Sequence, residues 1–252
     1  MGPASPPGTL LVLATYGLEI VEVGGAIASH VRAGGLAHAA VTLARPEARE
    51  QITRAAAVLG ASVQFMDFAV GTVTPDVESK KRFVKVIREV RPDIVITQDP
   101  EHSFHDLDPD RRQAMILYLE AMALAGRDFA PEQLTELQPH RIPTIYYMTP
   151  ERPNCVVDIT GVVEIKELAL AELRSQHAFS ARMMRQRLPA DTLAQVAGVP
   201  SDTDEESLGL AMHRRMDQAL HLYHGLMSHS AQAVFAEAYR REGLFTLSHL
   251  SR

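Results

Sequence analysis

The sequence has a single cysteine, no long apolar segment and no cluster of basic residues, and each absence excludes a class of protein. Cys155 alone rules out an internal disulfide and a thiolate metal site, so we expect a reducing, cytoplasmic compartment. No apolar run is long enough to span a bilayer. Residues 1–8 are rich in proline and glycine and lack the basic and apolar segments of a signal peptide, so we expect a disordered lead.

Charge and motif content exclude further classes. The net charge of −6 comes from 31 acidic and 25 basic residues spread along the chain, so we expect no nucleic-acid partner. The Gly-x-Ser-x-Gly elbow is missing, so nucleophile options are poor, and the missing P-loop and Gly-x-Gly-x-x-Gly fingerprint argue against a nucleotide cofactor. With 252 residues, 46% of them hydrophobic, the chain is long enough to bury a full core, and we expect one domain over 1–252.

Apolar runs alternate with helical patterns, which predicts an α/β fold with a Rossmann-like, mostly parallel sheet flanked by helices and a helical C-terminal region. The strands are expected at 9–14, 37–43, 62–68, 93–97, 144–148 and 155–159. The helices are expected at 21–33, 46–59, 77–90, 109–125, 162–187, 203–227 and 231–241. Residues from about 188 to 228 have the character of a helical insertion.

Two polar loops follow the first and fourth predicted strands, at 14–19 and 98–108. In an open α/β sheet, ligands bind in the crevice outside the carboxyl ends of the strands. We therefore expect these two loops to face each other across that crevice.

Four short motifs stand in order along nearly the whole chain. They are residues 14–19 with Gly-Gly at 24–25, residues 92–95 leading to 108–111, residues 158–160 with 175–176, and residues 236–240. Together they resemble the motifs of the PIG-L/LmbE-like N-acetylglucosaminyl deacetylases. That family has Ala-His-Pro-Asp-Asp-Glu at the first motif and His-Pro-Asp-His at the end of the second.

The resemblance implies zinc-dependent hydrolysis of N-acetyl or amide bonds on sugar-like or natural-product substrates. The family's zinc ligands correspond to Thr15, Leu18 and Arg111, of which leucine cannot ligate and arginine repels a cation. Its general base corresponds to Gly17 and its assisting histidine to Asp108. Without zinc, the pKa of an attacking water stays far above the value of about 7 that it has when bound to the metal. We therefore expect no metal at these positions and no hydrolysis by the family mechanism.

Arginine at position 111 suggests which group takes the place of the family's zinc ion. Its guanidinium can fill part of the vacated space and pair with Glu19, Asp108 or Asp110. A crevice built in this way can still bind an anionic or carbonyl-bearing ligand. The alternative is a purely structural ion pair at the start of a helix.

A relocated metal site is a second possibility for the same loop. Two histidines, His102 and His105, lie with three carboxylates at positions 99, 101 and 106. These side chains suit zinc by type, although exposed loops often carry such residues for solvation alone.

Two classes of function follow. The first is a divergent enzyme of the deacetylase superfamily, and the second is a catalytically inactive ligand-binding or partner protein that keeps the fold. The candidate catalytic residues are Glu19, Asp108, Asp110 and Arg111. The candidate substrate-binding residues are Thr15, Tyr16, Gly17, His105 and Tyr146. The expected partners are a small sugar-like or natural-product ligand and a second copy of the chain.

Overall fold

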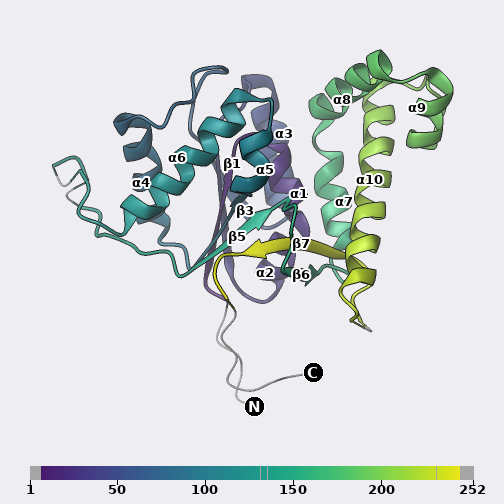
Figure 1. The fold of residues 1–252 in the computed structure, drawn as a ribbon. Coiled ribbons are helices and arrows are strands. Elements are labelled where there is room, and N and C mark those ends of the chain that lie inside the picture. The colour runs from purple at the N-terminus through teal and green to yellow at the C-terminus, as the bar shows by residue number, and fades with distance from the viewer. Residues whose placement is uncertain (1–6, 131, 135, 231, 245–252) are drawn as a thin grey trace.

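A seven-stranded sheet forms the centre of the molecule in the computed structural model, which describes residues 7–130, 132–134, 136–230 and 232–244 (Figure 1). The expected disordered lead lies mostly outside these residues. The strand order is β3-β2-β1-β4-β5-β7-β6, with β1 to β5 parallel and β7 antiparallel to both of its neighbours. The strands are β1 (Thr9–Ala14), β2 (Leu36–Val41), β3 (Ala61–Phe65), β4 (Ile94–Gln98), β5 (Thr144–Met148), β6 (Cys155–Asp158) and β7 (Ala236–Arg241).

Helices cover both faces of this sheet, and the first strand shows why. Leu10 and Val12 point into one apolar cluster while Leu11 and Leu13 point into another, because side chains alternate along a strand. The first cluster includes residues of α1 (Leu18–Glu22), α2 (Gly24–Arg32), α3 (Pro46–Val58) and α7 (Val163–Ala171). The second includes residues of α4 (Val77–Val90) and α6 (Pro109–Ala125). The predicted α/β fold with a mostly parallel sheet is confirmed.

A helical unit lies to one side of the sheet (Figure 1). It consists of α8 (Arg174–Arg187), α9 (Ala190–Ala197) and α10 (Glu205–Met227), which share a small apolar core of their own. The expected insertion at 188–228 corresponds to α9 and α10. The described residues contain no helix that is both long and apolar enough to cross a bilayer.

Several predicted elements differ from the structure, among them the single helix expected at 21–33, which is the two helices α1 and α2. The loop 98–108 contains a short helix, α5 (Pro100–His105), which begins after the side-chain cap of Asp99. The single helix expected at 162–187 is two helices, because Leu173 has a non-helical ψ of 52°. Helix α9 lies within the expected helical insertion, although no separate helix was predicted at its position.

The helix predicted at 231–241 is wrong, since the described part of this segment contains strand β7. The sequence Ala-Glu-Ala favours a helix locally, but β7 forms backbone hydrogen bonds with strands on both sides. Glu237 adds a buried anchor: its carboxylate accepts the N–H groups of Gly25 and Ala26 at 2.8 Å each. It also accepts Lys166 Nζ and the Tyr239 hydroxyl, each at 2.7 Å. Tertiary contacts therefore override the local helical preference.

Candidate functional site

The candidate site lies where β1 and β4 end side by side. These strands are parallel neighbours, with Leu13 opposite Thr97, so the loops that follow them leave the same edge of the sheet. After β1 the chain passes through Thr15 and Tyr16 into α1, and after β4 it passes through α5 into α6. The two polar loops therefore meet as the sequence predicts.

The Arg111 guanidinium is the centre of this site. Its Nη2 lies 3.6 Å from Glu19 Oε1, and its Nη1 lies 3.8 Å from Asp106 Oδ2. The guanidinium carbon lies 5.4 Å from the centre of the Tyr16 ring. Glu19 is buried at 1% exposure, whereas the Arg111 side chain is 26% exposed. The cation therefore lies between a buried carboxylate and the surface.

Asp108 joins the two loops. One carboxylate oxygen accepts the Tyr16 hydroxyl at 2.7 Å. The other accepts the backbone N–H groups of Asp110 and Arg111, at 2.9 and 3.4 Å, and so caps the start of α6. Asp108 was one of the expected partners of Arg111. Its carboxylate instead caps α6 and accepts the hydrogen bond of the Tyr16 hydroxyl.

Asp110 serves a different segment. Its carboxylate is buried and accepts the N–H groups of Gly71 and Val73, at 2.7 and 3.4 Å. These bonds tie the loop after β3 to the start of α6. The sequence places Asp110 with the catalytic candidates, while its contacts are those of a loop anchor.

Burial raises the pKa of two acidic residues of α1 near Arg111. It raises the pKa of Glu19 to about 8, although the Arg111 charge opposes the shift. Burial also raises the pKa of Glu22, which feels the charges of Arg111 and Lys166. Glu22 was not among the predicted site residues, but it follows Glu19 by three positions on α1, and this spacing places two helical side chains on one face.

Several buried polar atoms at this edge have no hydrogen-bond partner among the described residues. They are Thr15 Oγ1, Glu19 Oε1, Gln98 Oε1 and Ser103 Oγ, which come from the loop after β1, from α1, from the end of β4 and from α5. Buried polar atoms are normally satisfied, and each exception calls for a reason such as a bound ligand or water. This edge of the sheet therefore retains unused hydrogen-bonding capacity.

Gly17 and Tyr146 have packing contacts. A Cβ atom on Gly17 would lie 2.3 Å from the Ile52 side chain, so the first loop needs glycine for its close approach to α3. Tyr146 lies on β5 with its ring 6.1 Å from the Tyr239 ring. Thr15 is buried beside the Tyr118 hydroxyl. The contacts of these three expected ligand-binding residues are therefore packing contacts.

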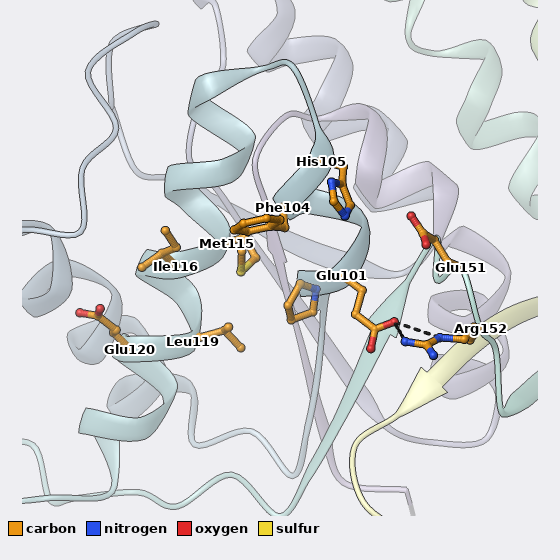
Figure 2. A pocket seen from close by; sticks show the side chains of 10 residues that line it. Glu101, Phe104, His105, Met115, Ile116, Leu119, Glu120, Glu151 and Arg152 are labelled. Atoms are coloured by element: carbon orange, nitrogen blue, oxygen red, sulfur yellow. Dashed lines mark hydrogen bonds and ion pairs between the residues drawn. The ribbon is translucent and has the colours of Figure 1, made fainter.

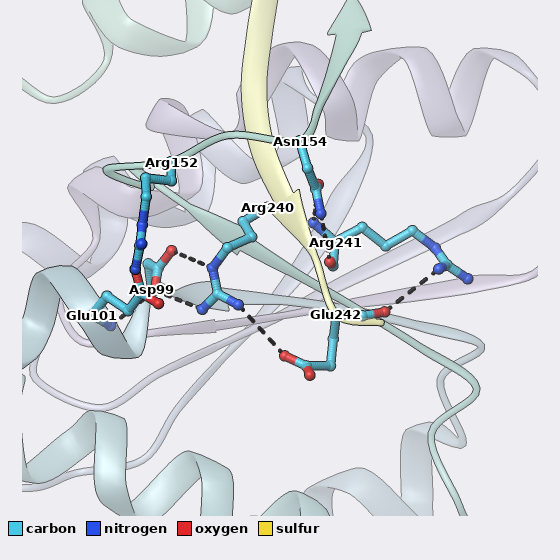
Figure 3. Close-up of polar contacts among 7 residues, drawn as sticks. All are labelled: Asp99, Glu101, Arg152, Asn154, Arg240, Arg241 and Glu242. Atoms are coloured by element: carbon cyan, nitrogen blue, oxygen red, sulfur yellow. Dashed lines mark hydrogen bonds and ion pairs between the residues drawn. The ribbon is translucent and has the colours of Figure 1, made fainter. Parts of the chain in front are cut away.

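The acidic residues of the second loop pair with arginines (Figure 3). Asp99 is fully buried and accepts two hydrogen bonds from Arg240, at 2.8 and 2.9 Å. Glu101 pairs with Arg152 at 2.7 Å. Within the part of the chain that the structure describes, no three His, Cys, Asp or Glu side chains form a group that could hold a metal ion. The structure therefore does not gather His102 and His105 with the loop carboxylates into a metal site.

A groove of about 710 Å³ opens beside the second loop, between α5, α6 and the loop after β5 (Figure 2). Glu101, Phe104 and His105 lie on its α5 side, where Glu101 pairs with Arg152 of the loop after β5, and Glu120 of α6 lies at its far side. Of the expected ligand-binding residues, His105 is the one that lines this groove.

Comparison with known proteins gives relatives of two kinds, although no protein-family model matches the chain. It is 35% identical over 130 residues to a diacetylchitobiose deacetylase of Thermococcus kodakarensis, an alignment that covers 50% of this chain and about half (48%) of the deacetylase. It is 28% identical over 206 residues to a 4-oxalmesaconate hydratase of Pseudomonas putida, covering 68% and 75% of the two chains.

Solved structures give the same two kinds of neighbour. A 4-carboxy-2-hydroxymuconate hydratase of Pseudomonas putida matches with a TM-score of 0.70 at 22% identity, over 97% of this chain and 100% of the other. An N,N'-diacetylchitobiose deacetylase of Pyrococcus horikoshii matches with a TM-score of 0.68 at 18% identity, over 92% and 83%. At these identities the structural matches establish the shared fold.

Proposed function

Because the sequence relatives and structural neighbours of this chain belong to the PIG-L/LmbE-like superfamily, we propose that it is a divergent member that binds a small carboxylate- or carbonyl-bearing ligand without zinc. In this proposal Arg111 supplies the positive charge of the crevice. The chain keeps the fold and the two loops of the family, but not its hydrolytic mechanism.

The donor set at the family's metal positions does not fit zinc. Thr15 offers one hydroxyl, Leu18 packs against the apolar core, and Arg111 carries a positive charge. Catalytic zinc needs three nitrogen, thiolate or carboxylate ligands. No step of a zinc mechanism can be assigned to these side chains.

The observation that carries the proposal is the loose pairing of Arg111. Its two ion pairs, at 3.6 and 3.8 Å, are longer than the roughly 2.8 Å of a charge-assisted hydrogen bond. The guanidinium has five N–H donors, and it is partly exposed. Donors held close to acceptors but not bonded to them are available to the oxygens of a ligand, and a carboxylate matches their planar geometry.

The first test is metal content with a restored ligand set. Elemental analysis of the purified protein is expected to find no stoichiometric zinc. The variant Thr15→His/Leu18→Asp/Arg111→His is expected to take up about one zinc per chain. Arg112→His is the matched control and is expected to stay metal-free. Stoichiometric zinc in the wild type, especially if lost in His102→Ala/His105→Ala, would overturn the proposal in favour of a relocated metal site.

The second test is ligand binding. A panel of small mono- and dicarboxylates is titrated into wild type and Arg111→Met by calorimetry. We expect at least a tenfold weaker affinity in the variant, because a charge-assisted bidentate pair is lost. Equal affinities would place the ligand elsewhere.

A second candidate is an active hydratase or amide hydrolase, favoured by the state of Glu19. With a pKa of about 8, this carboxyl group is protonated at neutral pH and can donate a proton to a ligand bound at Arg111. Candidate substrates are unsaturated carboxylates, as in the name of the hydratase relative, and N-acetylated sugars, as in that of the deacetylase. Turnover of either class that falls at least 100-fold in Glu19→Gln, with binding retained, would select this candidate.

A further inference from the structure

The crevice around Arg111 holds more acidic than basic side chains. Burial lowers the pKa of this guanidinium, but the charges of four carboxyl groups raise it by more, so its net shift is upward. The four are Glu19, Glu22, Asp106 and Asp108. Among the described residues, Arg111 is the one Lys or Arg side chain within ion-pair distance of any of them. One cation therefore faces an excess of acid.

This excess does not depend on the two glutamates of α1. Burial raises the pKa of both Glu19 and Glu22, which favours their neutral forms. Asp106 and Asp108 still set two carboxylates against one guanidinium, since an aspartate is ordinarily ionised at neutral pH. A ligand that brings only a carboxylate to Arg111 therefore also brings a negative charge close to two others, and like charges repel.

The unpartnered atoms at this edge of the sheet give independent evidence about the ligand. All four are oxygens: those of Glu19 and Gln98 accept hydrogen bonds, and the two hydroxyls can also accept them. Glu19, Gln98 and Ser103 are 1%, 3% and 0% exposed, so bulk solvent does not satisfy them. A carboxylate has no donor to offer these atoms, whereas an ammonium group has three N–H donors. A neighbouring cation also favours the ionised, accepting form of Glu19, whose Oε1 faces Arg111 at 3.6 Å.

We propose that the ligand of this crevice is a zwitterion with an ammonium group beside its carboxylate, as in an α-amino acid. This inference rests on the proposed function, because Arg111 binds the carboxylate. The ammonium group then lies against Asp106, whose Oδ2 is 3.8 Å from Arg111 Nη1. Both side chains are partly exposed, so a ligand reaches them from the surface. Protein charges this close together match the adjacent charges of an α-amino acid.

The first measurement compares amino acids with matched acids that lack the ammonium group. L-alanine and L-glutamate are titrated into the full chain by calorimetry at pH 7, against lactate and 2-hydroxyglutarate. We expect each amino acid to bind about tenfold more tightly or better, because charge-assisted hydrogen bonds to the ammonium group are added. The charges of 4-aminobutyrate are far apart, and this compound is expected to bind no more tightly than butyrate.

Asp106→Asn tests where the ammonium group lies. The amide oxygen can still accept the Asp108 N–H, which Asp106 Oδ1 accepts at 2.9 Å, so the turn before α6 is kept. The preference for the amino acid is expected to disappear in this variant. Asp191→Asn removes an exposed carboxylate of α9 and is the matched control, with the preference retained. Far-UV circular dichroism establishes that each variant is folded.

Arg111→Met separates this inference from the function on which it rests. Carboxylates that bind through Arg111 with no preference for the amino acid overturn the inference and leave the proposed function standing. Binding of both series that is unchanged in Arg111→Met overturns the proposed function and the inference together. A preference that persists in Asp106→Asn overturns the inference, as does the absence of amino acid binding at about 10 mM.

Discussion

Two cation–carboxylate pairs in this molecule, each with a buried carboxylate, differ in how fully their hydrogen-bonding groups are used. Glu237 accepts four hydrogen bonds, and Lys166 donates three, to Glu237, His221 and the Glu22 carbonyl. At the other pair, Arg111 lies 3.6 Å from Glu19, and Glu19 Oε1 has no hydrogen-bond partner in the part of the chain that the structure describes. The first pair is saturated and the second is not.

The pKa directions follow this difference. Burial raises the pKa of Glu237, but Lys166 and the hydrogen bonds from Tyr239 and Ala26 lower it further than burial raises it, so its net shift is downward. The pKa of Glu19 rises to about 8 because the Arg111 charge only partly offsets its burial. A saturated pair holds elements together, whereas an unsaturated one keeps capacity for a ligand.

The largest expected effect is on the saturated pair. Lys166→Met is expected to lower the free energy of unfolding by about 3–5 kcal/mol, because it leaves a buried carboxylate without its cation. Urea unfolding followed by far-UV circular dichroism measures the loss, with Arg111→Met as the comparison. A cost no greater than that of Arg111→Met would remove the distinction between the two pairs.

The second effect is a pH dependence of the unsaturated pair. The pKa of Glu19 is about 8 in the native protein and about 4.5 in the unfolded chain, so between these values the native state holds a proton that the unfolded chain has lost. The stability that Glu19 contributes is therefore fully present below pH 4.5 and is lost as the pH rises through about 8. The free energy of unfolding of Glu19→Gln, taken relative to wild type, is expected to be roughly 2–4 kcal/mol higher at pH 9 than at pH 5. Unfolding at pH 5, 7 and 9 measures it.

Arg111 provides the control for this pH profile. Its charge lowers the pKa of Glu19, so in Arg111→Met the loss of stability is expected to occur at higher pH. Parallel profiles for wild type and Glu19→Gln would mean that Glu19 is already ionised in the native protein.

A smaller effect concerns the link between the two loops. Asp108→Ala removes both the cap of α6 and the Tyr16 hydrogen bond, and is expected to cost about 1–2 kcal/mol. Tyr16→Phe removes only the hydrogen bond and is expected to cost about 1 kcal/mol. Tyr16→Phe in the Asp108→Ala background should then have almost no effect on the urea midpoint. A full, additive cost in that background would show that the two side chains act independently.

The smallest effect is expected at the surface pair of the groove. The Arg152 side chain is 78% exposed, so Arg152→Ala is expected to leave the urea midpoint unchanged, because solvent screens its attraction to Glu101. A clear loss of stability would mean that the pair secures the loop after β5.

The sequence predicts the parallel part of the sheet well, because its strands are continuous apolar runs between helical patterns. Strand β7 could not be predicted in this way, since its residues favour a helix and only β5, β6 and the buried Glu237 contacts make them extended. Local propensity is a weak guide where tertiary contacts are strong.

At the site, motif comparison predicts the contact between Arg111 and Glu19. The second carboxylate beside Arg111 is not one of the other two that the sequence suggests, Asp108 and Asp110. Asp106 takes that place because Asp108 is used as a helix cap and Asp110 as a loop anchor. These uses depend on where α6 begins and on the path of the loop after β3, which spacing alone does not determine. Glu22 was missed because no motif contains it.

The position of β7 has a consequence for how the chain assembles during synthesis. Strand β6 is an edge strand paired with β7, and about 80 residues separate Val157 from its partner Glu237. A nascent chain therefore carries β6, the Gly25 N–H and one donor of Lys166 without their β7 partners until the ribosome has passed residue 237. Such long-range pairing slows folding and leaves strand edges open to aggregation in the meantime.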